Sequence, residues 1–296
     1  MLQQALNRHP RILIPPETGY FLDFIGHTLR GQRRHLRSIN RDLGIDLPMP
    51  DRRVRNPIDV IAWYQRIAEA YTRIQRREGV EYFGDKSPRH LLRLERIASF
   101  LPEARILLIY RDGRDVAISL SKVPWSPPDV YVNFAIWLRF YRWHQWALRQ
   151  PNLHLIFLKY EDFVSDPEAH LRRVCEFLNV DYVPEMTEGR GGEGAFTEHE
   201  TAWKASSLEA INTSRIGVSK SELSETRLRR LERWGEKALT SLGYELIHTP
   251  TTRLPLWFFP RLYAKHSAWR LKCAIALATK ELFDSPISRT RSFALL

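Results

Sequence analysis

Apolar residues along the chain follow two alternating patterns. Near-continuous apolar runs at 104–111 (ARILLIYR) and 152–160 (NLHLIFLKY), with a shorter one at 11–14 (RILI), predict strands. Runs without polar alternation are typical of parallel strands that are covered on both faces. Segments with apolar residues at helical spacing separate the strands and predict helices at 2–8, 57–79, 131–150, 166–180 and 221–243. Strands that alternate with helices indicate an α/β fold with a parallel sheet flanked by helices.

The helix predicted at 57–79 is amphipathic, and Gly79 is expected to end it. Its apolar residues at helical spacing are expected to form the buried face: Ile58, Ile61, Ile67 (or Trp63), Ala70 and Ile74. The aromatic side chains of the helix at 131–150, Trp137 among them, are predicted to pack in the core under the sheet.

The net positive charge of the chain limits the classes of binding partner that we expect. The 296 residues include 45 Lys and Arg against 34 Asp and Glu, a formal net charge of +11, and basic residues concentrate in 30–55 and after Thr249. This excess suits nucleic acid, an anionic membrane surface, or a phosphorylated or sulfated small molecule. The middle of the chain is closer to neutral, which argues against a DNA-binding protein built around one basic groove.

Two cysteines, Cys175 and Cys273, form no disulfide framework and lack metal-ligand spacing, so we expect a cytoplasmic location and no metal. The sequence contains no apolar window of membrane-spanning length and no N-terminal signal region. The basic, aromatic segment 249–296 is predicted to be an extension of a domain at 1–248. A helix docked on that domain is favoured, and peripheral contact with an anionic membrane is the alternative.

Charged residues interrupt the core pattern at the end of one predicted strand, where Arg111 begins the run Arg-Asp-Gly-Arg-Asp. Ligands of open parallel sheets bind outside the carboxyl ends of the strands. We expect Asp115 to cap the following helix and Ser119 to lie near its first turn. A phosphate there would meet a guanidinium, a hydroxyl and a helix N-terminus. The alternative is a solvated turn in which Arg111 pairs with Asp112 or Asp115.

Two further turns carry candidate chemistry. In PPETGYF, Glu17 follows two prolines that restrict its backbone, and a carboxylate near an anionic ligand can have its pKa raised enough to take a proton. In GDKSPRH, Lys86 is a point cation that suits developing negative charge. The alternative for each is an ordinary surface residue.

The order of these motifs resembles that of the sulfotransferases that use 3′-phosphoadenosine 5′-phosphosulfate (PAPS). The resemblance rests on Pro-Glu-Thr, Gly-Asp-Lys-Ser-Pro, Tyr-Arg-Asp-Gly-Arg-Asp-Val-x-x-Ser, Lys-Tyr-Glu-Asp-Phe and INTSRIGVSK, and it covers about residues 1–245. It is strongest to the bacterial carbohydrate-like and tyrosylprotein-like branch. The resemblance implies a P-loop-NTPase-like fold and transfer of a sulfuryl group from PAPS to a hydroxyl or amine.

By position, the resemblance implies a role for five residues. Arg111 and Ser119 would hold the 3′-phosphate of the nucleotide, and Tyr160 would lie near the nucleotide. Glu17 would be the general base on the acceptor. Lys86 would support the sulfuryl group and the leaving phosphate. No metal is implied, because sulfuryl transfer depends on positioning and charge neutralisation that these side chains can supply.

The sequence departs from the family pattern in two places. The family's first strand and its Pro-Arg-Ser-Gly-Thr-Thr phosphosulfate loop do not precede residues 2–8 in this sequence. Met1 is therefore expected to be a mis-called or truncated start, and the alternative is a protein that has lost half of its donor site. The N-terminally truncated domain is expected to lack a central strand and to have weak stability and little turnover. Relatives commonly carry a basic residue where Val218 stands, and either Arg215 or Lys220 is expected to replace it. The GRGGEG stretch at 189–194 follows no strand and is interpreted as part of a lid or acceptor loop rather than a dinucleotide site.

The expected function is PAPS-dependent sulfation of a small-molecule, glycan or lipid-linked acceptor, without nucleic acid as a partner. One alternative is a degenerate sulfotransferase-like module that binds a nucleotide or anion without turnover. Another is a basic nucleic-acid or membrane-surface binder that uses residues 30–55 and the C-terminal segment.

Overall fold

The computed structural model describes residues 1–25, 27–188, 211–248 and 254–280, with side chains up to Cys273. The chain divides into two compact units. Unit 1 comprises Met1–Tyr110 and Ala147–Thr213, and unit 2 comprises Arg111–Trp146 and Ser214–Leu296. The GRGGEG stretch at 189–194, interpreted as part of a lid or acceptor loop, lies outside the described residues.

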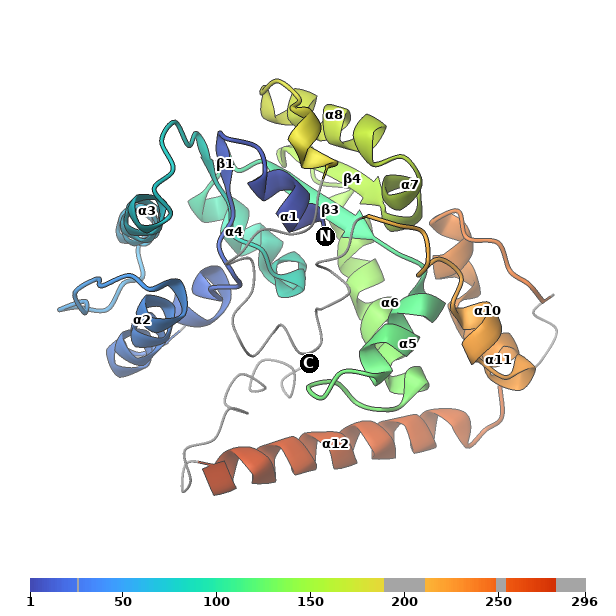
Figure 1. Ribbon diagram of the computed structural model, residues 1–296. Coiled ribbons are helices and arrows are strands. Elements are labelled where there is room, and N and C mark those ends of the chain that lie inside the picture. Colours follow the sequence, from blue (N-terminus) through green and yellow to red (C-terminus); the bar gives the residue numbers. More distant parts are fainter. Residues whose placement is uncertain (26, 189–210, 249–253, 281–296) are drawn as a thin grey trace. The chain divides into compact units, whose positions relative to one another are not determined.

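The strands of unit 1 are parallel, as predicted. β1 (Ile12–Leu13) pairs with β2 (Tyr82–Phe83), and β3 (Ile106–Tyr110) pairs with β4 (Leu155–Lys159). Figure 1 shows β3 and β4 as neighbouring arrows, and in the described chain the strands form two two-stranded sheets rather than the single sheet expected. β1 is short because Pro15 and Pro16 follow it and supply no backbone N–H for a longer ladder.

The prediction that the β3 strand is covered on both faces is wrong. Ile109 is 45% exposed, and the other β3 residues are only partly buried. In β4, by contrast, Leu158 is fully buried. A continuous apolar run therefore predicted the strand correctly but overestimated its burial.

The first core of unit 1 lies among the helices α2 (Leu29–Leu43), α3 (Pro57–Ile74) and α4 (Leu94–Phe100) and a π-helical turn at Tyr20–Phe24. A 3₁₀ turn at Pro88–Arg93, without buried residues, leads into α4. The residues of α3 that face this core are Val60, Trp63, Ile67 and Tyr71.

The predicted buried face of α3 is thus partly wrong, since Ile58 is 80% exposed and Ile74 is 48% exposed. Asn56 is the N-cap of α3, because its side chain accepts a hydrogen bond from the Asp59 N–H, and Pro57 is the first residue of the helix. The helix ends before Gly79, because Arg76 adopts a left-handed conformation with φ of 50°.

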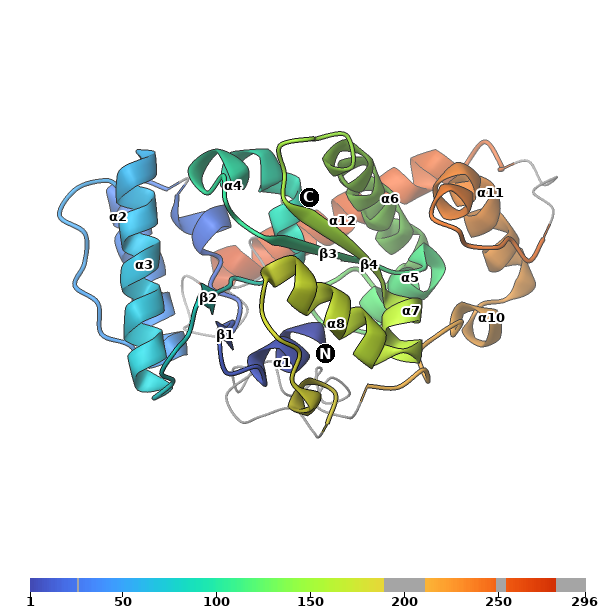
Figure 2. The ribbon, with the colours of Figure 1, turned by 90° about the horizontal axis from the view of Figure 1, so that it is seen from above.

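The second core of unit 1 surrounds β4. It is formed by α1 (Leu2–Asn7), α7 (Tyr160–Ser165), α8 (Pro167–Leu178) and a 3₁₀ turn at Pro184–Met186. Figure 2 shows α8 running alongside β4. The helix predicted at 166–180 is present as α8, with the Asp166 side chain as its cap and Pro167 in its first turn.

Unit 2 is helical, with α5 (Gly113–Ser121), α6 (Val130–Ala147), α10 (Ser219–Glu222), α11 (Glu225–Ser241) and α12 (Phe258–Lys280). Phe134 of α6 and Leu231 of α11 are completely buried, and the Phe134 ring lies 5.5 Å from that of Trp234 on α11. The ring of Phe258 lies 5.1 Å from that of Tyr131 and 5.4 Å from that of Trp234, so α12 is docked on the rest of this unit.

Candidate functional site

In unit 1 the two predicted turns lie against each other. The Lys86 ammonium donates a hydrogen bond to Glu17 Oε1, and the two side chains are 35% and 33% exposed. Glu17 and Lys86 are 69 positions apart and were predicted as separate candidates. The structure brings this carboxylate and this cation together at a partly exposed surface. This arrangement suits proton transfer next to developing negative charge.

A buried contact one residue away from each of these side chains holds the turns together. The Thr18 hydroxyl donates to Asp85 Oδ2 at 3.0 Å, and His90 Nε2 lies 3.5 Å from the same carboxylate. Burial opposes ionisation of Asp85, yet the contacts with His90 and Thr18 hold its pKa below the ordinary value. His35 Nε2 also bonds the Thr18 carbonyl at 2.9 Å, and burial lowers the pKa of this histidine.

In unit 2, Arg111 directly follows β3, and two contacts hold its guanidinium in one orientation. Its Nη2 lies 3.4 Å from Asp115 Oδ2 and also donates to the carbonyl of Arg215. The side chain of Arg111 is 17% exposed, whereas that of Asp115 is fully buried. The Arg111–Asp115 pair foreseen as an alternative is therefore present, but it is not a solvated turn.

The expectation that Asp115 caps the helix is wrong. The α5 cap is Asp112, whose side chain accepts from the Arg114 N–H at 2.9 Å. Asp115 instead accepts from the backbone N–H groups of Gly217, at 2.7 Å, and Ser219, at 2.9 Å. It thereby ties the 215–219 segment to α5 and to Arg111, a role that sequence reasoning missed because the partners are more than 100 residues apart.

Trp137 supports the same turn from α6. Its indole Nε1 donates to the Arg111 carbonyl at 3.1 Å, and a Cβ atom added to Gly113 would lie 2.3 Å from its ring. Glycine is therefore the residue that lets the indole approach this closely.

The second arginine of the turn has a different role from the first. Arg114 is buried between Asp112, at 2.7 Å, and Glu232. Burial alone would lower the pKa of its guanidinium, but Asp112 and Glu232 raise it. Arg114 is thus a structural charge, and Arg111 is the arginine of this turn with exposed surface.

Ser119 and Tyr160 complete the predicted set. Ser119 is exposed and lies in the last part of α5 rather than near its first turn, because the helix already begins at Gly113. Tyr160 begins α7 directly after β4 and packs partly against the second core of unit 1. Of the residues considered as replacements near Val218, Arg215 contributes its carbonyl to Arg111, and Lys220 is exposed.

No cluster of three or more His, Cys, Asp or Glu side chains suited to a metal ion occurs among the residues that the structure describes. In the same part of the chain, no helix combines the length and apolar character needed to cross a bilayer.

Comparison with known proteins defines the class. The sequence model of the sulfotransferase family matches residues 1–184, so the chain belongs to this family. Carbohydrate sulfotransferase 2 of Mus musculus and that of Homo sapiens are each 27% identical over 113 residues, 36% of this chain and 20% of theirs. A putative protein-tyrosine sulfotransferase of Caenorhabditis briggsae is 27% identical over 168 residues, 54% of this chain and 60% of that protein.

Solved structures support the fold. The sulfotransferase domain from the curacin biosynthetic pathway gives a TM-score of 0.57 at 18% identity, covering 83% of this chain and 93% of that domain. The sulfotransferase domain of the Synechococcus PCC 7002 olefin synthase gives 0.56 at 20% identity, covering 83% and 90%. The chain has the sulfotransferase fold, although it spans only 20% to 60% of the length of the curated relatives above.

Proposed function

We propose that the protein transfers a sulfuryl group from PAPS to a hydroxyl acceptor and that its parallel strands have the P-loop-NTPase-like arrangement. The observation that carries the donor assignment is the orientation of Arg111, held by Asp115 and the Arg215 carbonyl at the end of β3. A guanidinium already held in one orientation loses less side-chain entropy when it binds a phosphate.

Arg111 and Ser119 bind the 3′-phosphate of the donor in this proposal. The guanidinium supplies charge-assisted hydrogen bonds, and the exposed hydroxyl of Ser119 supplies a neutral one. Tyr160, at the end of β4, contacts the nucleotide. The family membership and the resemblance of these motifs support the assignment.

Glu17 acts as the general base and Lys86 as the cation beside the reacting sulfur. Glu17 accepts the proton of the acceptor hydroxyl as that oxygen forms its bond to sulfur. The bond between sulfur and the bridging phosphate oxygen breaks, and its electron pair leaves with adenosine 3′,5′-bisphosphate. Lys86 neutralises charge on the sulfuryl and leaving oxygens. The contact between the two side chains supports this pairing of roles.

We propose a small-molecule, glycan or lipid-linked glycan hydroxyl as the acceptor. The relatives named above are a carbohydrate sulfotransferase and a putative protein-tyrosine sulfotransferase, so a phenolic hydroxyl is the competing choice. A cytoplasmic location is part of the proposal, since both cysteines are free thiols.

The donor assignment is tested by thermal unfolding with adenosine 3′,5′-bisphosphate. Ligand at one hundred times its dissociation constant stabilises the folded state by about 2.7 kcal/mol, a clear rise in melting temperature. We expect this rise in the wild type and in Arg233→Ala, a control in unit 2 whose arginine pairs with Glu236. Arg111→Ala should lose it. Equal shifts in Arg111→Ala and the wild type, or none in the wild type, would remove the donor site.

The base assignment is tested by Glu17→Gln, with Glu81→Gln as the matched control. Glu81 is also a partly exposed glutamate of unit 1 that pairs with a cation, Arg11. Glu17→Gln should keep the nucleotide-induced shift and lose transfer by about 10²–10⁴-fold, as measured with radiolabelled PAPS. Unchanged transfer would refute the role of Glu17. Nucleotide binding without transfer in the wild type would favour a degenerate binding module.

A further inference from the structure

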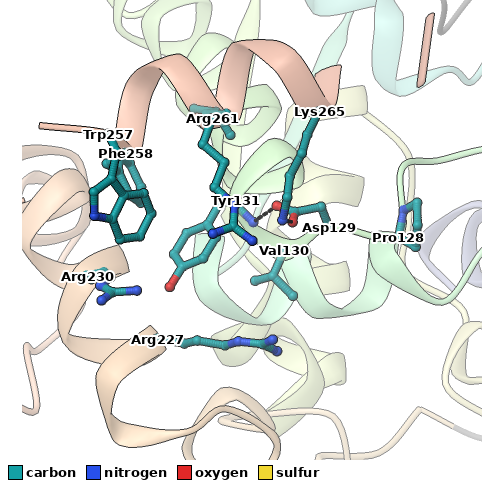
Figure 3. A pocket seen from close by; sticks show the side chains of 11 residues that line it. Pro128, Asp129, Val130, Tyr131, Arg227, Arg230, Trp257, Phe258, Arg261 and Lys265 are labelled. Atoms are coloured by element: carbon teal, nitrogen blue, oxygen red, sulfur yellow. Dashed lines mark hydrogen bonds and ion pairs between the residues drawn. The ribbon is translucent and has the colours of Figure 1, made fainter. Parts of the chain in front are cut away.

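A basic pocket in unit 2 is lined by none of the residues assigned to sulfuryl transfer. It has a volume of about 220 Å³ and is formed by residues 128–131, by α11 and by the start of α12. Figure 3 shows three arginines, Arg227, Arg230 and Arg261, entering it from two different helices.

These three arginines have no ion pair with a carboxylate anywhere in the described chain, whereas Lys265 at the pocket edge pairs with Asp129. The guanidiniums of Arg230 and Arg261 lie 5.3 Å and 5.6 Å from the centre of the Trp257 ring. Stacking on the indole holds both cations near each other despite their repulsion. A pocket with this excess of positive charge favours an anion.

The pocket also contains an unsatisfied hydroxyl. Tyr131 Oη is buried and has no hydrogen-bond partner among the described residues, and Figure 3 shows it pointing toward Arg230. A buried hydroxyl without a partner is unfavourable, because folding removes its hydrogen bonds to water and supplies none in return. An oxygen-rich ligand would accept its hydrogen bond and those of the arginines together.

Exposed apolar side chains lie beside the pocket at the start of α12. Leu256 is 98% exposed, Tyr263 75%, Phe259 51% and Trp257 48%. Among the described residues, the inner side of the helix is already occupied, because Phe258 and Cys273 are buried. The four exposed apolar side chains therefore require a partner other than the rest of unit 2. A small soluble anion in the pocket would leave these side chains uncovered.

We propose that this surface binds an anionic phospholipid membrane, with a head-group phosphate in the arginine pocket and the apolar side chains of α12 inserted at the interface. Tryptophan and tyrosine favour this interface, because their rings are apolar and their polar atoms can remain hydrated. Arginine attracts anionic lipid there. The contact is peripheral, and the surface uses none of the residues assigned to sulfuryl transfer.

Sedimentation of the full chain with vesicles tests the proposal. We expect it to bind vesicles of phosphatidylcholine with 30 mol% phosphatidylglycerol, to bind phosphatidylcholine alone weakly, and to lose binding as salt rises. Equal binding to both vesicles, or none to either, would overturn the proposal.

A double variant, Arg230→Gln with Arg261→Gln, tests the pocket. Each basic residue near an anionic surface contributes about fivefold in affinity, so loss of two should lower the partition coefficient by about 25-fold. Arg229→Gln is the matched control on α11, because the Arg229 side chain is partly exposed and already paired with Glu225 at 3.0 Å. Equal binding by the double variant and the wild type would refute the head-group site. An unchanged melting temperature and an unchanged response to adenosine 3′,5′-bisphosphate separate this result from unfolding and from the donor proposal.

The apolar contact is tested by Leu256→Ser, which should weaken vesicle binding by about tenfold. The control is Ile58→Ser, since Ile58 is a similarly exposed aliphatic residue in unit 1. Two results would point to other occupants and overturn the membrane proposal. One is unchanged vesicle binding by Leu256→Ser together with displacement from vesicles by millimolar glycerol 3-phosphate at constant ionic strength. The other is a dimer in sedimentation equilibrium that Leu256→Ser converts to a monomer without changing vesicle binding.

Discussion

The close approach of Trp137 to Gly113 makes the Arg111 turn sensitive to a single methyl group. In Gly113→Ala the new Cβ would lie 2.3–2.5 Å from three ring atoms of Trp137. Real carbon atoms do not approach this closely, so either the indole or the start of α5 must move. Movement of either stretches the bond from the indole to the Arg111 carbonyl, which is 3.1 Å long in the wild type.

The expected loss of stability follows from three contributions. Overpacking in a well-filled interior costs about 1–3 kcal/mol. Loss of the indole hydrogen bond adds about 0.5–1.5 kcal/mol. Alanine recovers at most about 0.5–1 kcal/mol relative to glycine in a helix. The contributions sum to a net destabilisation of about 0.5–4 kcal/mol, with a central value of about 2 kcal/mol. At about 2–4 °C per kcal/mol, the central value lowers the melting temperature by about 4–8 °C.

Urea unfolding of a double-mutant cycle with Trp137→Leu provides the measurement. Gly113→Ala should lower the urea midpoint in the wild type without a change of slope. In the Trp137→Leu background its cost should fall by at least about 1 kcal/mol, because the smaller side chain leaves room for the methyl group. The same cost in both backgrounds, or no cost in the wild type, would show that the indole does not restrict the turn.

Three further predictions concern buried charges. Arg114→Met should lower the free energy of unfolding in urea by about 3–5 kcal/mol, because Asp112 and Glu232 would stay buried without the Arg114 cation. A loss of less than about 1 kcal/mol would contradict this prediction. Asp115→Ala should lower the free energy of unfolding by about 2–4 kcal/mol, because two backbone N–H groups lose their acceptor. It should also weaken binding of adenosine 3′,5′-bisphosphate, because Arg111 loses its contact with this carboxylate. Unchanged binding by calorimetry would argue against positioning of Arg111 by Asp115. The pKa of Asp85 in the folded state lies below the ordinary value of 3.8, so its contribution to stability should be complete above pH 3.8 and be lost as the pH falls through the folded-state pKa. Asp85→Asn should remove this acid-dependent loss from the profile of unfolding free energy against pH. An unchanged profile would exclude the Asp85 carboxylate as its cause.

Local patterns predicted the elements better than they predicted their environments. The helix predicted at 166–180 is present as α8, because its start depends on residues adjacent in the chain, the Asp166 cap and Pro167. For α3, the same kind of reasoning found the helix but chose Ile58 and Ile74 as core residues, and both are exposed. Helical periodicity alone allows more than one apolar stripe, and packing against neighbouring helices selects one of them.

The sequence by itself determined the parallel strands, the position of Arg111 after β3 and the sulfotransferase resemblance, since these depend on residues close together in the chain or on the order of motifs. Only the tertiary structure decided that Glu17 contacts Lys86, that Asp115 holds the 217–219 backbone, and that arginines of α11 and α12 share a pocket. These contacts join residues about 30 to more than 100 positions apart. Their partners are selected by the packing of whole elements, which no local pattern of polar and apolar residues specifies.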